Sequence, residues 1–237
     1  MAREKTFRFK QFSVLNDKSA MKVGTDGVLL GAWCDVSCSK KVLDVGTGTG
    51  LVALMVAQRS DAEIIGIEIE HDATCEAEYN FSVSPWHERL SVKEIDFNGF
   101  VDTCNEKFDT IVSNPPYFVN SLECPDEKRM QARHTCKLTY EQLLTGAKHL
   151  LSENGHICLI TPVEAEQDIC DITKLIELRV NKKVYVKSVV DGVDKRILWQ
   201  ISEKGDSCLV ETFAIEKSRH VYTDEYIALT RDFYLKM

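Results

Sequence analysis

The fold is decided by residues 41–50, Lys-Val-Leu-Asp-Val-Gly-Thr-Gly-Thr-Gly. The first half of this stretch is apolar enough to form a short buried strand, and residues 51–57, Leu-Val-Ala-Leu-Met-Val-Ala, predict an apolar helix directly after it. A strand, a glycine-rich turn and a helix form the first unit of a doubly wound α/β domain, and turns of this kind hold nucleotide-like ligands. Glycine suits such a turn because it adopts positive φ and lets a ligand approach the backbone.

The spacing of the glycines separates two classes of cofactor. A dinucleotide fingerprint, G-x-G-x-x-G, that began at the first glycine would need glycine at position 51, which is leucine. The chain instead places an acid two residues before three alternating glycines, which resembles motif I of the S-adenosylmethionine (SAM) methyltransferases. SAM carries an ammonium and a sulfonium group in place of a pyrophosphate, so acids around the loop suit its charge. From this stretch we expect the following cofactor contacts: Asp44, Gly46, Thr47, Gly48 and Gly50.

Strands and helices alternate along the rest of the chain. Short apolar runs predict strands, and longer runs with helical spacing predict helices. Strands are predicted at residues 63–69, 90–95, 108–113, 156–161, 180–190 and 196–203, and helices at 71–82, 139–151 and 164–177. Together with the strand that precedes the glycines, they predict an α/β fold with a doubly wound, mostly parallel seven-stranded sheet and helices on both faces.

The N-terminal 40 residues precede this sheet and are interpreted as a cap segment of a single domain that covers residues 1–237. Phenylalanines alternate with basic residues near the start and predict an edge strand with one buried face. Thr25 or Asp26 is expected to cap a short helix over residues 27–34, which would lie next to the glycine loop in sequence and close over the cofactor.

The C-terminal part is expected to finish the sheet. The turn-forming residues 191–195 predict a hairpin, so that the last strand of the seven is antiparallel. Residues 208–215 predict an extra edge strand, and residues 222–237 predict a short helix rich in aromatic side chains. Residues 118–137 are polar and without a clear period, which predicts a loop.

Acids occur where two of the predicted strands end, and ligands of such sheets sit beyond the carboxyl ends of the strands. Glu68 lies 22 residues after Gly46, where an acid can accept hydrogen bonds from both ribose hydroxyls; Glu70 is the alternative. Asp96 is placed to accept from the amine of adenine, and Phe97 to flank the adenine ring. An ordinary helix N-cap is the alternative interpretation of Asp96.

The tetrapeptide Asn114-Pro115-Pro116-Tyr117 follows the strand at 108–113. An exocyclic amine on a base is a poor nucleophile because its lone pair is delocalised into the ring. The side-chain oxygen of Asn114 and the carbonyl of Pro115 can accept hydrogen bonds from its two N–H groups and free the lone pair for attack on a methyl group. The prolines stiffen the backbone, and the Tyr117 ring can stack on a flipped base. We therefore predict that these four residues form the catalytic amine site.

The glycine loop and the Asn-Pro-Pro-Tyr tetrapeptide together resemble the two motifs of the amino-group methyltransferases, which act on adenine, guanine or glutamine. Three further stretches narrow the resemblance: residues 20–33 (Ala-Met-Lys-Val-Gly-Thr-Asp-Gly-Val-Leu-Leu-Gly-Ala-Trp), Ser84-Pro85-Trp86, and the tail from Tyr222. Over nearly the whole chain the sequence resembles the bacterial tRNA(Val) adenine-N6 methyltransferases. The resemblance implies SAM as cofactor, tRNA as partner, and methylation of the adenosine 3′ of the anticodon. It also implies that the block from Lys22 to Asp26 lies near the methionine end of SAM. The cofactor contacts added in this way are Lys22, Gly24, Thr25, Asp26 and Asn114.

The composition indicates which kinds of partner, metal site and membrane segment are to be expected. The formal net charge is -8 and the sequence pI is about 5.3, so a general nucleic-acid binder is not indicated, although a local basic patch would suffice. The nine cysteines are scattered and odd in number, which indicates reduced thiols in the cytoplasm and no metal site. The apolar runs are too short for a membrane span, and we favour a monomer. Basic residues expected to hold the RNA are Arg133, Lys182, Lys183, Lys187 and Arg196.

Three other functions fit part of the pattern. A protein glutamine N5-methyltransferase shares the amine motif but carries a sizeable helical domain ahead of the glycine loop, where this chain has only 40 residues. An RNA guanine-N2 methyltransferase is the second alternative, and a SAM-binding protein without catalysis is the third. A DNA adenine methyltransferase would need a target-recognition region for which the chain has little room.

Overall fold

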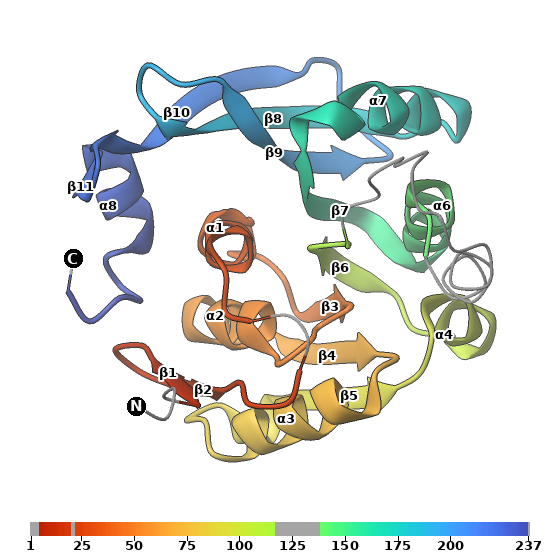
Figure 1. Cartoon of the computed structure of the whole chain (residues 1–237). Helices are drawn as coiled ribbons and strands as arrows, with labels where there is room; N and C mark the ends of the chain where they lie inside the picture. The colour runs from red at the N-terminus through yellow and green to blue at the C-terminus, as the bar shows by residue number, and fades with distance from the viewer. Residues whose placement is uncertain (1–4, 20–21, 117–137, 237) are drawn as a thin grey trace, which may run out of the picture.

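A central sheet organises the computed structural model of this chain, which describes residues 5–19, 22–116 and 138–236. Within these residues the sheet has nine strands (Figure 1). Their spatial order is β11 (Val221–Tyr222), β10 (Leu209–Ser218), β8 (Arg179–Val189), β9 (Asp194–Ser202), β7 (Leu151–Pro162), β6 (Phe108–Ser113), β3 (Lys41–Val45), β4 (Glu63–Glu68) and β5 (Leu90–Glu94). Neighbouring strands from β5 to β7 are parallel, and β9 is antiparallel to both of its neighbours.

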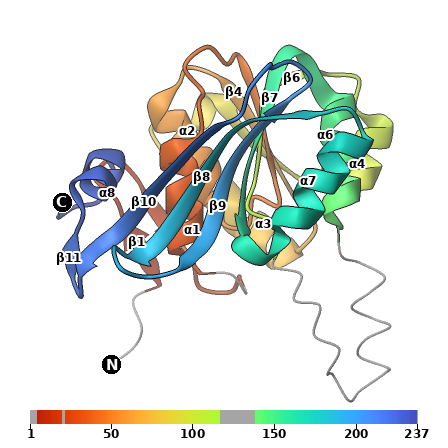
Figure 2. The same ribbon diagram turned by 90° about the horizontal axis from the view of Figure 1, so that it is seen from above.

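The seven predicted strands are all present, and the hairpin between β8 and β9 makes β9 antiparallel as expected. The prediction of seven strands is nevertheless wrong for the sheet as a whole. The predicted edge strand is β10, which pairs in parallel with β8, and β11 adds a further short strand beside it. Figure 2 shows β8, β9 and β10 side by side. Helix α8 (Asp224–Thr230) lies next to β10, and α7 (Glu166–Leu175) lies on the opposite side of these three strands.

Helices cover both faces of the sheet, as the α/β prediction requires. The layer on one face consists of α1 (Thr25–Trp33), α2 (Leu51–Arg59), α3 (His71–Ser82) and α8. On the other face the described residues place α4 (Phe97–Thr103), α6 (Tyr140–Leu150) and α7. The same part of the chain also contains two short 3-10 helices, η1 (His87–Arg89) and η2 (Val163–Ala165). Successive residues of β3 supply both layers: Val42 packs into the first, and Leu43 into the second. A strand buried on both faces is apolar at nearly every position, which explains its sequence.

The N-terminal segment differs from its prediction in two respects. Its first residues do not join the main sheet: β1 (Thr6–Arg8) and β2 (Ser13–Leu15) form a separate antiparallel hairpin. The helix that follows starts earlier than expected, and its N-cap is Gly24, with no side-chain hydrogen bond. Thr25 and Asp26 therefore lie inside the first turn and do not cap it.

Helix α1 packs directly on α2, and both helices run in the same direction. A Cβ atom added to Gly27 would lie 3.0 Å from the Leu51 side chain, and one added to Gly31 would lie 2.8 Å from Cβ of Met55. Each glycine of α1 therefore faces a residue in the corresponding turn of α2. Since α2 starts at the end of the glycine loop, the amino end of α1 lies beside that loop.

Candidate methyltransferase site

The glycine loop between β3 and α2 has the backbone conformation that its sequence predicts. Gly46, Gly48 and Gly50 have φ of 70°, 57° and 84°, all in the left-handed region. A Cβ atom on Gly46 or Gly48 would meet nothing within 4 Å, whereas one on Gly50 would lie 2.4 Å from the Phe81 ring. The first two glycines therefore border open space that a ligand can use, and the third serves packing.

Asp44 supports this loop from inside the protein. Its carboxylate accepts hydrogen bonds from the Thr47 hydroxyl (2.6 Å) and from the backbone N–H of Ala53 (3.1 Å), and the residue is 1% exposed. Burial raises the pKa of Asp44 to about 7, although its two hydrogen bonds act in the opposite direction. Asp44 and Thr47 thus shape the loop through contacts within the protein.

The buried carboxyl of Asp44 predicts a pH dependence of stability. Its folded pKa of about 7 lies above the ordinary 3.8, so its contribution to stability is full below pH 3.8 and is lost as the pH rises through 7. An asparagine side chain cannot ionise, so Asp44→Asn should gain stability relative to wild type between pH 5 and pH 8, by about 2 kcal/mol. Urea titrations of the cofactor-free proteins at both pH values measure this, and a difference that does not change with pH would contradict the raised pKa.

Glu68 reaches the same loop from the end of β4. One oxygen of its carboxylate accepts from the Gly48 N–H (2.9 Å), and the other accepts from the N–H groups of Ile69 (2.8 Å) and Glu70 (3.0 Å). Glu70 is the exposed N-cap of α3 and makes no side-chain capping bond. Of the two acids considered for the ribose, the structure therefore brings Glu68 to the glycine loop.

Asp96 follows the end of β5, next to Glu68 across the sheet, because the Ile95 N–H donates to the Glu68 carbonyl (2.9 Å). Its side chain caps α4 by accepting from the Gly99 N–H (3.0 Å), as the alternative interpretation expected. Asp96 is also exposed, so its carboxylate is accessible to a ligand. The Phe97 ring is buried against Gly146 of α6, and its contact with an adenine stays a prediction.

The amine motif leaves the sheet beside the glycine loop. Val45 of β3 and Ser113 of β6 are register partners, and the Ser113 hydroxyl donates to the Val45 carbonyl (2.8 Å). The residues that follow them, Gly46 and Asn114, therefore emerge next to each other at the carboxyl edge of the sheet. Asn114 is partly exposed, Pro115 is buried and Pro116 is exposed. The fourth residue of the motif, Tyr117, lies outside the described residues.

The N-terminal block approaches this edge from the side of α1. Lys22 donates to the carbonyls of Asn16 and Asp17 (both 3.1 Å). Asp26 forms an ion pair with Arg196, whose register partner on β7 is Pro162 at the carboxyl end of that strand. Burial raises the pKa of Asp26, while Arg196 opposes that shift. The block and the strand ends thus meet at one edge of the sheet.

Comparison with known proteins fits this arrangement. Residues 19–170 match the model of the family described as "Methyltransferase small domain". A Bacteroides fragilis protein named tRNA1(Val) (adenine(37)-N6)-methyltransferase is 49% identical over 232 residues, which cover 98% of each chain. The chain belongs to the family of these methyltransferases. A member from Bacteroides thetaiotaomicron is 45% identical over 98% of both chains.

The fold of this methyltransferase also occurs in more distant proteins. A solved structure of a predicted O-methyltransferase from Agrobacterium tumefaciens superposes with a TM-score of 0.67 over 88% of this chain and 96% of that one. The two sequences are 18% identical, so the likeness concerns the fold alone. The doubly wound sheet predicted from sequence is thus the fold of known methyltransferases.

Most of the basic residues expected to bind RNA already have partners in this methyltransferase. Lys182 pairs with Glu211 (2.9 Å), and Lys183 pairs with Glu166 (2.7 Å). Arg196 pairs with Asp26, as described above. Within the described part of the chain no ion pair includes Lys187, which is partly exposed near the end of β8. Arg133 lies outside the described residues.

Two buried polar residues of α3 were missed by the sequence analysis. Glu76 and Asn80 are 4% and 1% exposed, and both contact the N-terminal segment. They belong to a buried stripe with Ala73 and Ala77, at the spacing of one helix face. A polar residue at the spacing of an otherwise apolar helix face indicates a buried, hydrogen-bonded side chain, and this signal was present in the sequence.

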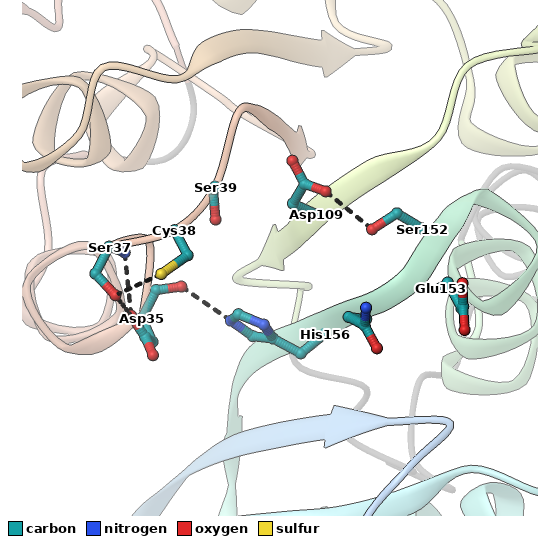
Figure 3. Close-up of a pocket in the computed structure, with 9 residues that line it drawn as sticks. Asp35, Ser37, Cys38, Ser39, Asp109, Ser152, Glu153 and His156 are labelled. Atoms are coloured by element: carbon teal, nitrogen blue, oxygen red, sulfur yellow. Dashed lines mark hydrogen bonds between the residues drawn. The ribbon is translucent and has the colours of Figure 1, made fainter.

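A cavity of about 440 Å³ lies at the opposite edge of the sheet, near the amino ends of β3, β6 and β7 (Figure 3). There His156 contacts the Asp35 carbonyl through Nε2 (2.9 Å), and the Ser152 hydroxyl donates to Asp109 (2.9 Å). Burial lowers the pKa of His156. None of the predicted site residues lines this cavity, so it is separate from the carboxyl edge where the motifs meet.

The cysteines and acids of the described residues do not form a metal site: no group of three His, Cys, Asp or Glu side chains there has the necessary arrangement. The seven cysteines found in those ranges are all free thiols. No helix in the described part of the chain is long and apolar enough to span a bilayer.

Proposed function

We propose that this protein transfers a methyl group from SAM to the N6 amine of adenosine 37 in tRNA1(Val). The observation that carries the proposal is the register of β3 and β6, which sets Asn114 directly beside the glycine loop. A loop that holds a methyl donor and a motif that accepts amine protons must be neighbours for in-line transfer. The names of relatives that are 42–49% identical supply the position and the tRNA.

The residues at the edge of the sheet fit the cofactor. Open space beside Gly46 and Gly48 accommodates a ligand that approaches the backbone, and Glu68 presents a carboxylate at the same place for ribose hydroxyls. The first N–H groups of a helix have no acceptor within the helix and lie at the positive end of its dipole, so the amino end of α1 suits the SAM carboxylate. Asp26 does not counteract this, because Arg196 balances its charge. We assign Lys22, Gly24 and Thr25 to this end, and Asp96 to the adenine.

When bound, SAM supplies an electrophilic methyl group on its sulfonium. The target amine keeps both protons until the methyl group has moved from sulfur to nitrogen, and it then releases one proton to solvent. The side-chain oxygen of Asn114 accepts a hydrogen bond from one N–H of this amine, and the Pro115 carbonyl accepts a hydrogen bond from the other. These two bonds localise the nitrogen lone pair and direct it at the methyl group. Pro115 and Pro116 have no N–H groups that would compete for the same acceptors. Tyr117 is assigned as the stacking surface for the base.

Adenosine 37 suits an enzyme of this size and charge. Extracting a base from a duplex costs a few kcal/mol, whereas a loop presents its bases unpaired. With a net charge of -8 the protein has limited means to offset that cost on a duplex. It should therefore read the surrounding RNA through shape and backbone contacts. We place the reaction in the cytoplasm, in a monomer whose residues 1–237 form one domain.

Lys187 is the best remaining candidate among the described basic residues for contact with tRNA phosphates. It lies toward the same edge as Asn114, and its ammonium forms no ion pair within the described ranges. Lys187→Ala should reduce the slope of log affinity against log salt concentration by about 1. Lys204→Ala is the control, because Lys204 pairs with Glu153 at the opposite edge. Filter-binding titrations with tRNA over a range of salt concentrations measure both slopes, and equal slopes for Lys187→Ala and wild type would exclude Lys187 from the interface.

The alternatives are separated by their products. Purified protein is incubated with tritiated SAM and, in turn, tRNA1(Val) transcript, duplex DNA and a glutamine peptide, and labelled nucleosides are identified by mass spectrometry. We expect N6-methyladenosine in the transcript, little label in DNA and none in the peptide. N2-methylguanosine would instead indicate the guanine-specific alternative, label in the peptide the glutamine-specific one, and no label anywhere a non-catalytic protein.

A further inference from the structure

A carboxylate buried in α3 holds the N-terminal segment by its backbone. Glu76 is 4% exposed, and one of its oxygens accepts from the N–H groups of Asp17 and Lys18, both at 2.7 Å. Its other oxygen accepts from the Ser19 N–H at 3.1 Å. Three successive backbone donors thus converge on one carboxylate, and bonds to an ionised acceptor are stronger than those between neutral groups. The donors are backbone N–H groups, which every residue except proline would supply at positions 17–19.

One turn later, Asn80 ties the same segment to the glycine loop. Its amide nitrogen donates to the carbonyls of Leu15 (3.0 Å) and Thr49 (2.8 Å), and its oxygen accepts from the Leu15 N–H (2.7 Å). Leu15 is the last residue of β2, and Thr49 lies between the second and third glycines. The next residue, Phe81, places its ring under Gly50. A single face of α3 therefore contacts both the loop and the N-terminal segment.

Through these contacts, α3 fixes the relative position of two sides of the proposed cofactor site. The glycine loop is one side. The other is the block that starts at Lys22, three residues after Ser19, and leads into the amino end of α1 beside the loop. A shift of residues 15–19 would move the block away from the loop without changing the sheet. Small displacements of positioning groups have large effects on ligand geometry.

We infer that Glu76 and Asn80 are positioning residues for SAM: they hold the N-terminal segment and the glycine loop at the separation that the cofactor requires. The inference rests on the SAM site of the proposed function, but it does not depend on the RNA substrate. It also explains why a charged residue and a buried amide lie on the packed face of α3.

The test is calorimetric binding of S-adenosylhomocysteine, which needs no RNA. In Glu76→Gln an amide N–H₂ replaces one acceptor oxygen and opposes the Ser19 N–H or the other two donors. In Asn80→Ala all three bonds to Leu15 and Thr49 are lost. We expect the dissociation constant to rise about tenfold or more in both variants. The matched control is Glu78→Gln, the same change at an exposed position of the same helix, which should stay within about twofold of wild type.

Hydrogen exchange of the unsubstituted protein gives a second readout that needs no variant. Binding of S-adenosylhomocysteine should slow exchange of the amides of residues 17–19, because the ligand and the bonds to Glu76 stabilise the same arrangement. Folded Glu76→Gln and Asn80→Ala proteins with wild-type affinity would overturn the inference, and so would unchanged exchange in wild type on saturation. If the wild-type protein bound S-adenosylhomocysteine tightly but did not methylate tRNA, only the proposed substrate would be overturned.

Discussion

Replacing Asn114 by alanine is expected to lower kcat for methyl transfer by about a hundredfold or more, in the range found when one group that stabilises a transition state is removed. The side-chain oxygen of Asn114 accepts a hydrogen bond from an amine N–H whose acidity increases as the amine attacks, so this hydrogen bond is stronger in the transition state than in the ground state. Most of the affinity for SAM should remain, because the glycine loop and Glu68 are unchanged. The stability of the fold should change little, since Asn114 is partly exposed and lies beyond the end of β6.

The matched control is Asn105→Ala. Asn105 is exposed and precedes the same strand, so the change is identical but lies at the opposite end of β6. Single-turnover rates at saturating SAM and tRNA separate chemistry from binding. A rate for Asn114→Ala equal to that of Asn105→Ala would remove Asn114 from the role assigned here.

Replacing Gly48 by valine should abolish cofactor binding, for two reasons that add. The space around its Cα is open and would be filled by the new side chain, and a φ of 57° is strained for a β-branched residue. Such a conformation costs about 1–3 kcal/mol. A backbone that relaxes to relieve this strain would also move the Gly48 N–H away from the Glu68 carboxylate. Calorimetry with S-adenosylhomocysteine is the measurement, with circular dichroism to verify the fold.

Gly48→Ala provides the graded comparison, because it places a smaller, unbranched side chain at the same positive φ and therefore introduces less strain. We expect its affinity to lie between those of wild type and Gly48→Val. Wild-type affinity in a folded Gly48→Val protein would mean that the cofactor does not approach the loop backbone at this position.

The centre of the fold could be predicted from sequence because its signals are local. The glycine pattern after β3 fixes the loop conformation, and the apolar runs of β4 and β6 fix where Glu68 and Asn114 emerge. Adjacent parallel strands then bring these residues to one edge. No pairing detail was needed for that step.

The errors arose where pairing or capping depends on distant partners. The alternating phenylalanines near the N-terminus suit either an edge strand or a hairpin, and β1 pairs with β2 instead of the sheet. The polar, turn-like residues before Gly155 belong to β7 through an irregular pairing with β6, which a periodicity argument does not detect. Thr25 or Asp26 was expected as a cap, but both lie in the first turn of α1, where Asp26 is held by Arg196, 170 residues away.

The basic residues show the same limitation more clearly. Lys183 and Arg196 stand out in the sequence as positive charges, yet each is paired with a carboxylate in the fold: Lys183 with Glu166 on the preceding helix, and Arg196 with Asp26, 170 residues away. Glu76 was passed over for the converse reason, since an acid on a helix is usually solvated and its backbone partners at 17–19 become visible only in the fold.

The central claim is tested most directly by mass spectrometry of tRNA1(Val) isolated from cells that lack this protein. Nuclease fragments that contain position 37 are compared between wild-type cells, the deletion strain, and the deletion strain that expresses either the wild-type protein or Asn114→Ala. The account predicts N6-methyladenosine at position 37 in wild type and with the wild-type protein restored, and unmodified adenosine in the other two. N6-methyladenosine at position 37 in the deletion strain, or its restoration by Asn114→Ala, would contradict the account.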